Sequence, residues 1–309
     1  MSDETLDSAI LRTVLYADVF DFALTVNELH RFLMHHSPVA LAEIERSLDG
    51  SPALDAALAR SGDLVALKTR DSLFAIRHER EAIAGQLWPL ARRYAAALSL
   101  LPFVRMVALT GALAMRNPVS TDDDLDYLIV TRPGRVWLAR LATVMLVRVV
   151  RLTGTVICPN FVLAEDALGQ NRRDVYIAHE VTQAVPFFGG ALYDRLRAEN
   201  RWTDAHLPNA HGAPHPEQIR GASRTGNAVK RALEWAFNGT LGDRIEAWEK
   251  ARKLRRFEAM RQAASAARVD DSQVKGHFND HGGNVLAQYR RRLSAYGLTE
   301  RIDTELAAD

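Results

Sequence analysis

Residues 104–130 read VRMVALTGALAMRNPVSTDDDLDYLIV, and this stretch determines the fold class that we expect. It holds two apolar runs, 104–109 and 125–130, which have the length and the aliphatic composition of buried strands. Downstream, 134–152 has the apolar spacing of a helix and 155–163 that of a third strand. This alternation of short strands and helices predicts a core of mixed α/β or α+β class.

Two aspartates, Asp124 and Asp126, stand on either side of Leu125 where the second strand begins. Because side chains alternate along a strand, both carboxylates point to the same face of the sheet. Like charges side by side repel each other unless a cation or a shared proton compensates them, and Mg²⁺ or Mn²⁺ is the usual partner of carboxylate oxygens. The pattern therefore predicts a divalent metal site. The alternative for the acidic run 120–124 is a solvated turn or a helix cap, which does not explain an aspartate inside the strand.

A glycine, Gly111, stands between the first strand and a short helical segment, so that free backbone N–H groups are available to bind a phosphate. The order strand, glycine, helix and then Asp-Leu-Asp-Tyr on the next strand resembles the signature of the nucleotidyltransferase superfamily that includes polymerase beta. The resemblance covers about residues 100–165. It implies that Thr110, Gly111 and Ala112 bind the nucleotide. It also implies that Asp124 and Asp126 are the catalytic metal ligands.

Enzymes of this superfamily transfer a nucleoside monophosphate from a nucleoside triphosphate to a hydroxyl, with metal ions held by the aspartates and pyrophosphate as the leaving group. The resemblance thus implies a metal-dependent nucleotidyltransferase that uses Mg²⁺ or Mn²⁺ and a nucleoside triphosphate. The sequence does not identify the acceptor, which is a protein, an RNA or a small molecule.

Two positions depart from the family pattern. Family members carry a serine after the motif glycine, where this chain has Ala112, so that a hydroxyl would come from Thr110 or Thr121. The third catalytic carboxylate of the family lies in the next strand, where this chain has Asn160, whose amide oxygen can ligate a metal but cannot act as a base. Glu165, just beyond that strand, is our candidate for a third metal ligand. Further candidates are Asp122, Asp123 and Asp166.

These two departures favour a second hypothesis more strongly than an intact motif would. The chain would then be a catalytically weakened regulator that senses nucleotide or metal and acts through its amino-terminal module. A structural adaptor is the third hypothesis.

The first 80 residues resemble a winged helix in their predicted topology. Helical patterns within 6–60 precede two short apolar runs, 64–67 and 73–76, which surround a polar turn and predict a hairpin. Thr25 and Glu28 have the spacing of a capping box at the start of the second helix.

Winged helices either bind DNA or serve as protein–protein modules, and in the first case the helix expected at 39–48 would lie in the major groove. That helix carries Glu43, Glu45 and a single arginine, Arg46, whereas groove reading needs cationic and amide side chains. Nucleic acid is therefore one of two alternatives for the partner of the module.

The rest of the chain divides into three expected regions by its composition. These are a nucleotidyltransferase core with connecting helices at 81–202, a linker or loop at 203–226 and a helical C-terminal region at 227–309. Because a capped helix pair followed by a hairpin closes its own apolar faces, we expect 1–80 to fold as a separable module. The basic stretch 241–293 either binds an RNA or another phosphate-rich substrate or forms a solvated helix face.

Several side chains that can react or bind a metal are expected to have structural roles only. His179 and Glu180 lie on an expected helix and either line the cleft or face the solvent, and we expect the solvent because such a pair on an amphipathic helix is more often a surface feature. We expect His277 and His281 as surface or cap residues because no third ligand accompanies them. Cys158 is expected in the core rather than as a nucleophile.

The composition limits the partners and the compartment that we expect. The 309 residues carry 39 lysines and arginines and 38 aspartates and glutamates, so no net field draws the chain to a membrane or to nucleic acid. The most apolar stretch, 136–152, is interrupted by arginines and is shorter than the roughly 20 residues that a membrane span needs. A single cysteine and an acidic start lead us to expect a cytoplasmic protein without disulfides or a membrane partner.

Overall fold

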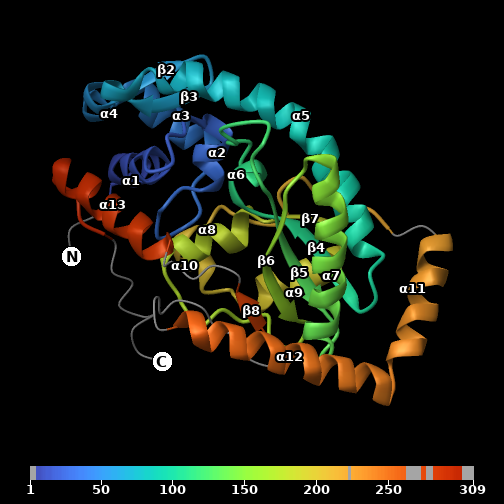
Figure 1. Ribbon diagram of the computed structural model, residues 1–309. Helices are drawn as coiled ribbons and strands as arrows, with labels where there is room; N and C mark the ends of the chain where they lie inside the picture. Colours follow the sequence, from blue (N-terminus) through green and yellow to red (C-terminus); the bar gives the residue numbers. More distant parts are fainter. Residues whose placement is uncertain (1–4, 222–223, 262–272, 276–280, 301–309) are drawn as a thin grey trace.

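The computed structural model describes residues 5–221, 224–261, 273–275 and 281–300, which form a mixed α and β structure with two sheets (Figure 1). The first sheet belongs to the N-terminal module, residues 5–70, and has the antiparallel order β1-β3-β2. Short helices pack around this sheet. The elements of the module are α1 (Leu6–Asp18), β1 (Leu24–Thr25), α2 (Val26–Arg31), α3 (Leu41–Gly50), α4 (Pro52–Ala57), β2 (Leu58–Ser61), β3 (Leu64–Leu67) and η1 (Lys68–Arg70).

The hairpin of the module lies earlier in the chain than the sequence pattern predicts. Strands β2 and β3 pair as far as Ser61↔Leu64, and Gly62 takes a φ of +62° in the turn between them. Residues 73–76, expected as the second strand, instead begin the long helix α5 (Leu73–Ser99). The expectation is wrong because a four-residue apolar run has no period of its own and here belongs to the helix that follows it.

The capping box of α2 is confirmed. The Glu28 amide donates to Thr25 Oγ1 at 3.1 Å, and the Thr25 amide donates to Glu28 Oε2 at 2.8 Å. The same Glu28 carboxylate accepts from the buried Arg77 of α5, with 3.0 Å between Nη2 and Oε1. The cap therefore also fixes the module to the long helix that leads into the rest of the chain.

The larger sheet has the strand order β7-β4-β5-β6-β8, in which β5 and β6 are parallel and the other neighbours are antiparallel. Helices cover both of its faces: Val107 and Leu109 pack with α5 and α7, whereas Met106 and Ala108 pack with α8 and α9. The three strands expected from the sequence are confirmed as β4, β5 and β6. The elements are β4 (Val104–Leu109), α6 (Gly111–Ala114), β5 (Leu125–Thr131), α7 (Val136–Val150), η2 (Arg151–Thr153), β6 (Ile157–Ala164), α8 (Val175–Gln183), β7 (Val185–Phe188), α9 (Gly190–Glu199) and β8 (Gln273–Lys275).

Two edge strands were not predicted. β7 is short and carries Pro186, which a sheet tolerates at its edge because no ladder hydrogen bond is needed there. β8 lies inside 227–309, which the sequence pattern assigned wholly to helices, so that expectation is wrong at this point. The helices of this region are α11 (Arg224–Phe237), α12 (Thr240–Arg261) and α13 (His281–Ala295). Among the described residues, none of the helices is both long and apolar enough to cross a membrane.

The N-terminal module shares its hydrophobic core with distant parts of the chain. Its buried side chains form one cluster with Ala178 of α8 and with Leu286 and Tyr289 of α13. The expectation that residues 1–80 close their own apolar faces is therefore wrong, because α8 and α13 complete that core.

The first part of the expected linker 203–226 also packs against the module. Residues 207–210 are buried, after the short helix α10 (Thr203–His206) and before η3 (Pro216–Gln218). Asn209 accepts a hydrogen bond from the Val39 amide at 3.0 Å and donates to the His30 carbonyl at 2.8 Å. This part of the segment is an ordered bridge between α9 and the module.

Candidate functional site

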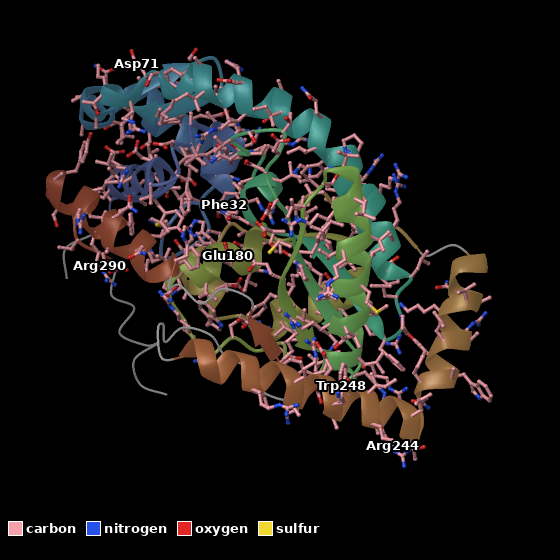
Figure 2. All side chains as sticks on the ribbon, viewed as in Figure 1. Phe32, Asp71, Glu180, Arg244, Trp248 and Arg290 are labelled. Carbon is pink, nitrogen blue, oxygen red and sulfur yellow. The ribbon has the colours of Figure 1, made fainter. Side chains whose placement is uncertain are left out.

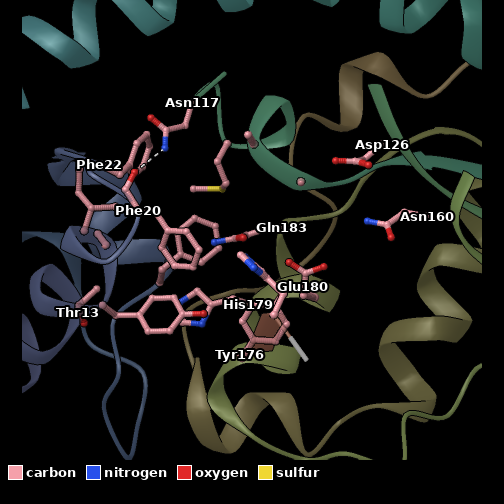
Figure 3. A pocket seen from close by; sticks show the side chains of 18 residues that line it. Thr13, Phe20, Phe22, Asn117, Asp126, Asn160, Tyr176, His179, Glu180 and Gln183 are labelled. Atoms are coloured by element: carbon pink, nitrogen blue, oxygen red, sulfur yellow. Dashed lines mark hydrogen bonds between the residues drawn. The ribbon is translucent and has the colours of Figure 1, made fainter. Parts of the chain in front are cut away.

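A cavity of about 480 Å³ lies where the N-terminal module meets the larger sheet (Figure 3). In Figure 2, Phe32 of the module and Glu180 of α8 lie close to this junction, in the interior of the molecule. The cavity is lined by residues from α1, β1, α6, β5, β6, α8 and α13 and from the segments that follow α1, α2 and α6. It has the size of a small-molecule site.

Gly111 and Asp126 touch each other in the wall of this cavity. β4 and β5 are neighbours, so that the Thr110 amide, just after β4, donates to the Asp126 carbonyl at 2.9 Å. Gly111 follows with a φ of +69°, and a Cβ atom at this position would collide with the Asp126 carboxylate. Only glycine combines this backbone conformation with so close an approach. The glycine and the aspartate that the sequence singled out are thus adjacent in space.

The pKa of Asp126 is raised to about 6, chiefly because the carboxyl is largely buried. The negative charges of Asp124 and Asp123 raise it further, whereas a hydrogen bond with the Cys158 thiol lowers it. Burial raises the pKa of Cys158 to about 12, so the thiol stays protonated at neutral pH and does not act as a nucleophile. Asp126 is therefore a largely buried carboxylate that has no ion pair with a cationic side chain in the described part of the chain.

The other residues of the acidic run occupy different environments. Asp124 is exposed and does not line the cavity, although its charge acts on Asp126. Asp123 closes its own turn, because its carboxylate accepts from the Val119 amide at 2.6 Å. The solvated-turn interpretation thus fits Asp123 and does not fit Asp126.

Asn160 opens into the same cavity as Asp126. β6 runs parallel to β5 with Cys158 opposite Asp126, and an irregularity in the register places Asn160 within the cavity wall. Its side chain has no hydrogen-bond partner among the described residues. In Figure 3 the carboxylate and the amide lie at the same end of the cavity.

Glu165, our candidate for a third metal ligand, lies at the opposite end of the strands. Its amide donates to the Thr131 carbonyl at 2.9 Å, five positions along β5 from Asp126. At about 3.3 Å per residue, this separation is on the order of 16 Å, too far to share a metal. The candidate is wrong because the parallel pairing of β5 and β6 places Asp126 and Glu165 at opposite ends of the two strands. The register of this pairing cannot be seen in the sequence. Its neighbour Asp166 is excluded for the same reason.

The expected nucleotide-binding residues are only partly brought together. Gly111 and Ala112 line the cavity, whereas Thr110 and Thr121 do not. Thr110 is the N-cap residue of α6 but its hydroxyl makes no capping hydrogen bond. Thr121 is exposed in the acidic turn.

Helix α8 presents one face to the cavity, which for His179 and Glu180 was the less favoured of the two positions considered from sequence. Tyr176, His179, Glu180 and Gln183 all line the cavity, at the i, i+3, i+4 and i+7 spacing of one helix face. The expectation that His179 and Glu180 lie on the surface is wrong at this site, because α8 is covered by the N-terminal module. The helical spacing was the signal that could have grouped them.

His179 is a neutral part of the cavity wall. It is 3% exposed, and its ring stacks on that of Tyr16 with 4.1 Å between centroids. Burial lowers the pKa of His179 to about 4, and Nδ1 lies 2.8 Å from the Val175 carbonyl oxygen. His281 also lines the cavity, at the start of α13, whereas His277 lies outside the described residues.

Metal-ligating side chains do not form a complete cluster in the described part of the chain: three or more His, Cys, Asp or Glu groups do not converge there on one point. Asp126 and the amide oxygen of Asn160 are the expected oxygen donors that line the cavity, whereas Asp124 lies outside it.

Comparisons with known proteins do not extend this picture. The sequence matches no family model and no curated protein, and the fold matches no solved structure. The interpretation of the site therefore depends on its geometry and chemistry.

The raised pKa of Asp126 makes a prediction about metal binding and pH. A divalent cation needs the ionised carboxylate, so the affinity for Mn²⁺ should be constant above pH 7 and fall by about tenfold for each pH unit below 6. Calorimetric titration between pH 5 and 8 measures this. A decrease that begins only near pH 4, the ordinary range of an aspartate, would contradict it.

Proposed function

We propose that the chain is a metal-dependent nucleotidyltransferase whose donor nucleotide lies in the cavity between the N-terminal module and the larger sheet. The observation that carries the proposal is the packing of Gly111, at positive φ, against the Asp126 carboxylate in the cavity wall. Any larger residue at 111 would cover this carboxylate. Gly111 and Asp126 thus place backbone atoms and a negatively charged carboxylate side by side, where a ligand in the cavity meets both.

The donor atoms fit Mg²⁺ or Mn²⁺. In the cavity Asp126 would supply a carboxylate oxygen and Asn160 an amide oxygen, and the exposed Asp124 would supply a second carboxylate from outside the cavity; these are ligands that such ions take. The raised pKa of Asp126 is what a buried carboxylate without its counter-charge should have. A bound ion would neutralise phosphate charge and polarise the acceptor hydroxyl.

In the proposed reaction the oxygen of an acceptor hydroxyl forms a bond to the α-phosphorus of a nucleoside triphosphate. The bond from that phosphorus to the bridging oxygen breaks, and pyrophosphate leaves with the electron pair. The hydroxyl proton needs an acceptor. Among the described residues that line the cavity, the carboxylates are Asp126 and Glu180, and Glu180 is the one not assigned to the metal.

The second candidate is a nucleotide or metal sensor, which Asn160 favours. A neutral amide at this position adds no charge to the metal site and accepts no proton. In this case the ligand would bind between the module and the sheet and no transfer would follow.

Release of pyrophosphate distinguishes these two functions. The protein is incubated with Mn²⁺ and each α-³²P-labelled nucleoside triphosphate, with and without cellular RNA and protein as acceptors. We expect labelled acceptor and an equal amount of pyrophosphate, both lost in Asp126→Asn. Tight nucleotide binding without pyrophosphate would favour the sensor, and a protein that binds neither a nucleotide nor Mn²⁺ would contradict both.

Asn160→Asp tests the role of the amide. The new carboxylate adds an anionic oxygen beside Asp126, so we expect Mn²⁺ to bind up to about tenfold more tightly at pH 8 and transfer to become faster. Calorimetry and pyrophosphate release measure the two effects. The matched control is Asn27→Asp, at an exposed position of α2 that does not line the cavity. Weaker Mn²⁺ binding in Asn160→Asp would show that residue 160 does not face the metal.

A further inference from the structure

The end of the cavity far from Asp126 is built from aromatic side chains of the N-terminal module. Phe20, Phe22, Phe32 and Tyr16 line it, together with the neutral ring of His179. In Figure 3, Phe20 and Phe22 lie on the opposite side of the cavity from Asp126 and Asn160. Planar rings stack favourably on such walls.

Tyr16 places an unsatisfied hydroxyl in this wall. The residue is 4% exposed, and its Oη atom is buried without a hydrogen-bond partner among the described residues. A buried polar atom left unpaired is costly, so such atoms normally indicate a missing partner. Tyr16 lines the cavity, and a ligand there can supply that partner once the side chains that cover the hydroxyl move aside.

Gln183 provides a second unpaired polar group. Its side chain is half-buried, lines the cavity and has no hydrogen-bond partner in the described part of the chain. Figure 3 shows it between Phe20 and Glu180. A primary amide offers both a donor and an acceptor in one plane, which matches the edge of a heterocyclic base.

The described cavity wall provides no cationic side chain at either end, so an anion in the cavity needs a metal ion as counter-charge, and such an ion is proposed only beside Asp126. None of the described lining residues is a lysine or an arginine. A phosphate group would have no counter-charge beside the aromatic rings, whereas an uncharged ring would need none.

The aromatic wall is fixed relative to the catalytic end. Asn117, just after α6, donates from Nδ2 to the Phe20 carbonyl at 3.0 Å. Arg80 of α5 donates to the same carbonyl at 3.2 Å, to the Asp21 carbonyl at 3.1 Å and to Asn117 Oδ1 at 2.9 Å. These bonds hold the loop after α1 at a fixed distance from Gly111 and Asp126. A ligand that contacts both ends of the cavity needs such a fixed spacing.

From this arrangement we propose that the aromatic end of the cavity is a nucleobase subsite, in which the Tyr16 hydroxyl and the Gln183 amide bind the edge of the base. The inference builds on the proposed function, because it assigns the base of the same donor nucleotide whose phosphates lie near Asp126. It also gives the N-terminal module a role in substrate binding in place of the DNA binding considered from sequence.

Calorimetry with separate parts of the nucleotide tests the subsite. The probes are the common nucleosides without metal, inorganic tripolyphosphate with Mg²⁺ and the nucleoside triphosphates with Mg²⁺. We expect Gln183→Leu and Tyr16→Phe each to weaken the best nucleoside and its triphosphate by about tenfold and to leave tripolyphosphate unchanged. Asp126→Asn should weaken tripolyphosphate and leave the nucleoside unchanged. Gln288→Leu, on the exposed face of α13, is the control.

Folding does not obscure the result, because Tyr16→Phe removes only an unpaired atom. Without ligand this variant should melt about 2–4 °C higher than the unmodified protein. A lower melting point would mean that the hydroxyl is satisfied within the protein and would overturn its proposed role.

The outcomes separate the two proposals. If triphosphates bind but neither Gln183→Leu nor Tyr16→Phe weakens them, the subsite is wrong and the proposed function stands. If a nucleoside binds and the two variants weaken it while Asp126→Asn leaves tripolyphosphate unchanged, the subsite stands and the proposed function is wrong. If no nucleoside and no nucleotide binds, both are wrong.

Discussion

Asp126→Asn is expected to weaken the Mn²⁺-dependent binding of a nucleoside triphosphate by about 100-fold or more and to abolish pyrophosphate release. Loss of a group that only orients a metal ligand costs about 10- to 100-fold, and the loss of the charged ligand itself should cost more. The amide keeps the size of the side chain. Equilibrium binding and the release assay measure the two effects.

The same variant should stabilise the protein in the absence of metal. Because folding raises the pKa of Asp126 to about 6, the ionised carboxylate destabilises the folded state at neutral pH, by on the order of 2–3 kcal/mol. This cost is present above pH 6 and disappears below about pH 4, where the carboxyl is protonated in both states. Urea unfolding at pH 8 and pH 4 should therefore show a gain only at pH 8.

Asp122→Asn is the matched control, since it removes an exposed carboxylate from the same acidic turn. We expect it to change neither stability nor nucleotide binding by more than about twofold. Equal effects of the two variants would mean that only the total negative charge of the turn affects stability and nucleotide binding. The assignment of Asp126 as a metal ligand would then be wrong.

Gly111→Ala should destabilise the protein by about 3 kcal/mol and weaken nucleotide binding together. The left-handed conformation costs a residue with a side chain about 1–2 kcal/mol, and the new Cβ must also displace the Asp126 carboxylate. Urea unfolding measures the first effect and calorimetry the second.

Gly85→Ala provides the contrast, because Gly85 is in helix α5 and a Cβ there meets nothing within 4 Å. This change should stabilise the helix by up to about 1 kcal/mol. In an Asp126→Ala background, the penalty of Gly111→Ala should fall, since the colliding carboxylate is gone. A penalty that is the same in both backgrounds would contradict the contact between residues 111 and 126.

Local sequence patterns predicted the parts of the fold that depend on neighbouring residues. The strands β4 and β5 and the capping box at Thr25 are confirmed, because strand alternation and helix capping are set within a few residues. The closeness of Gly111 and Asp126 follows from β4 and β5 being adjacent.

Features that depend on distant contacts were not predictable from these patterns. Glu165 was misplaced because the register of β6 against β5 decides which edge a residue reaches. His179 was assigned to the surface because the module that covers α8 is more than 100 residues earlier in the chain. Tyr16 and Gln183 carry no motif at all, and only the cavity brings them together.

The most direct test of the account is a crystal structure of the protein with Mn²⁺ and a nucleoside triphosphate, using the anomalous scattering of manganese. We expect an anomalous peak within ligand distance, about 2.2 Å, of Asp126, and the base between Phe20 and Gln183. Manganese or nucleotide bound elsewhere, with Asp126 left in contact only with Gly111 and Cys158, would contradict the central claim.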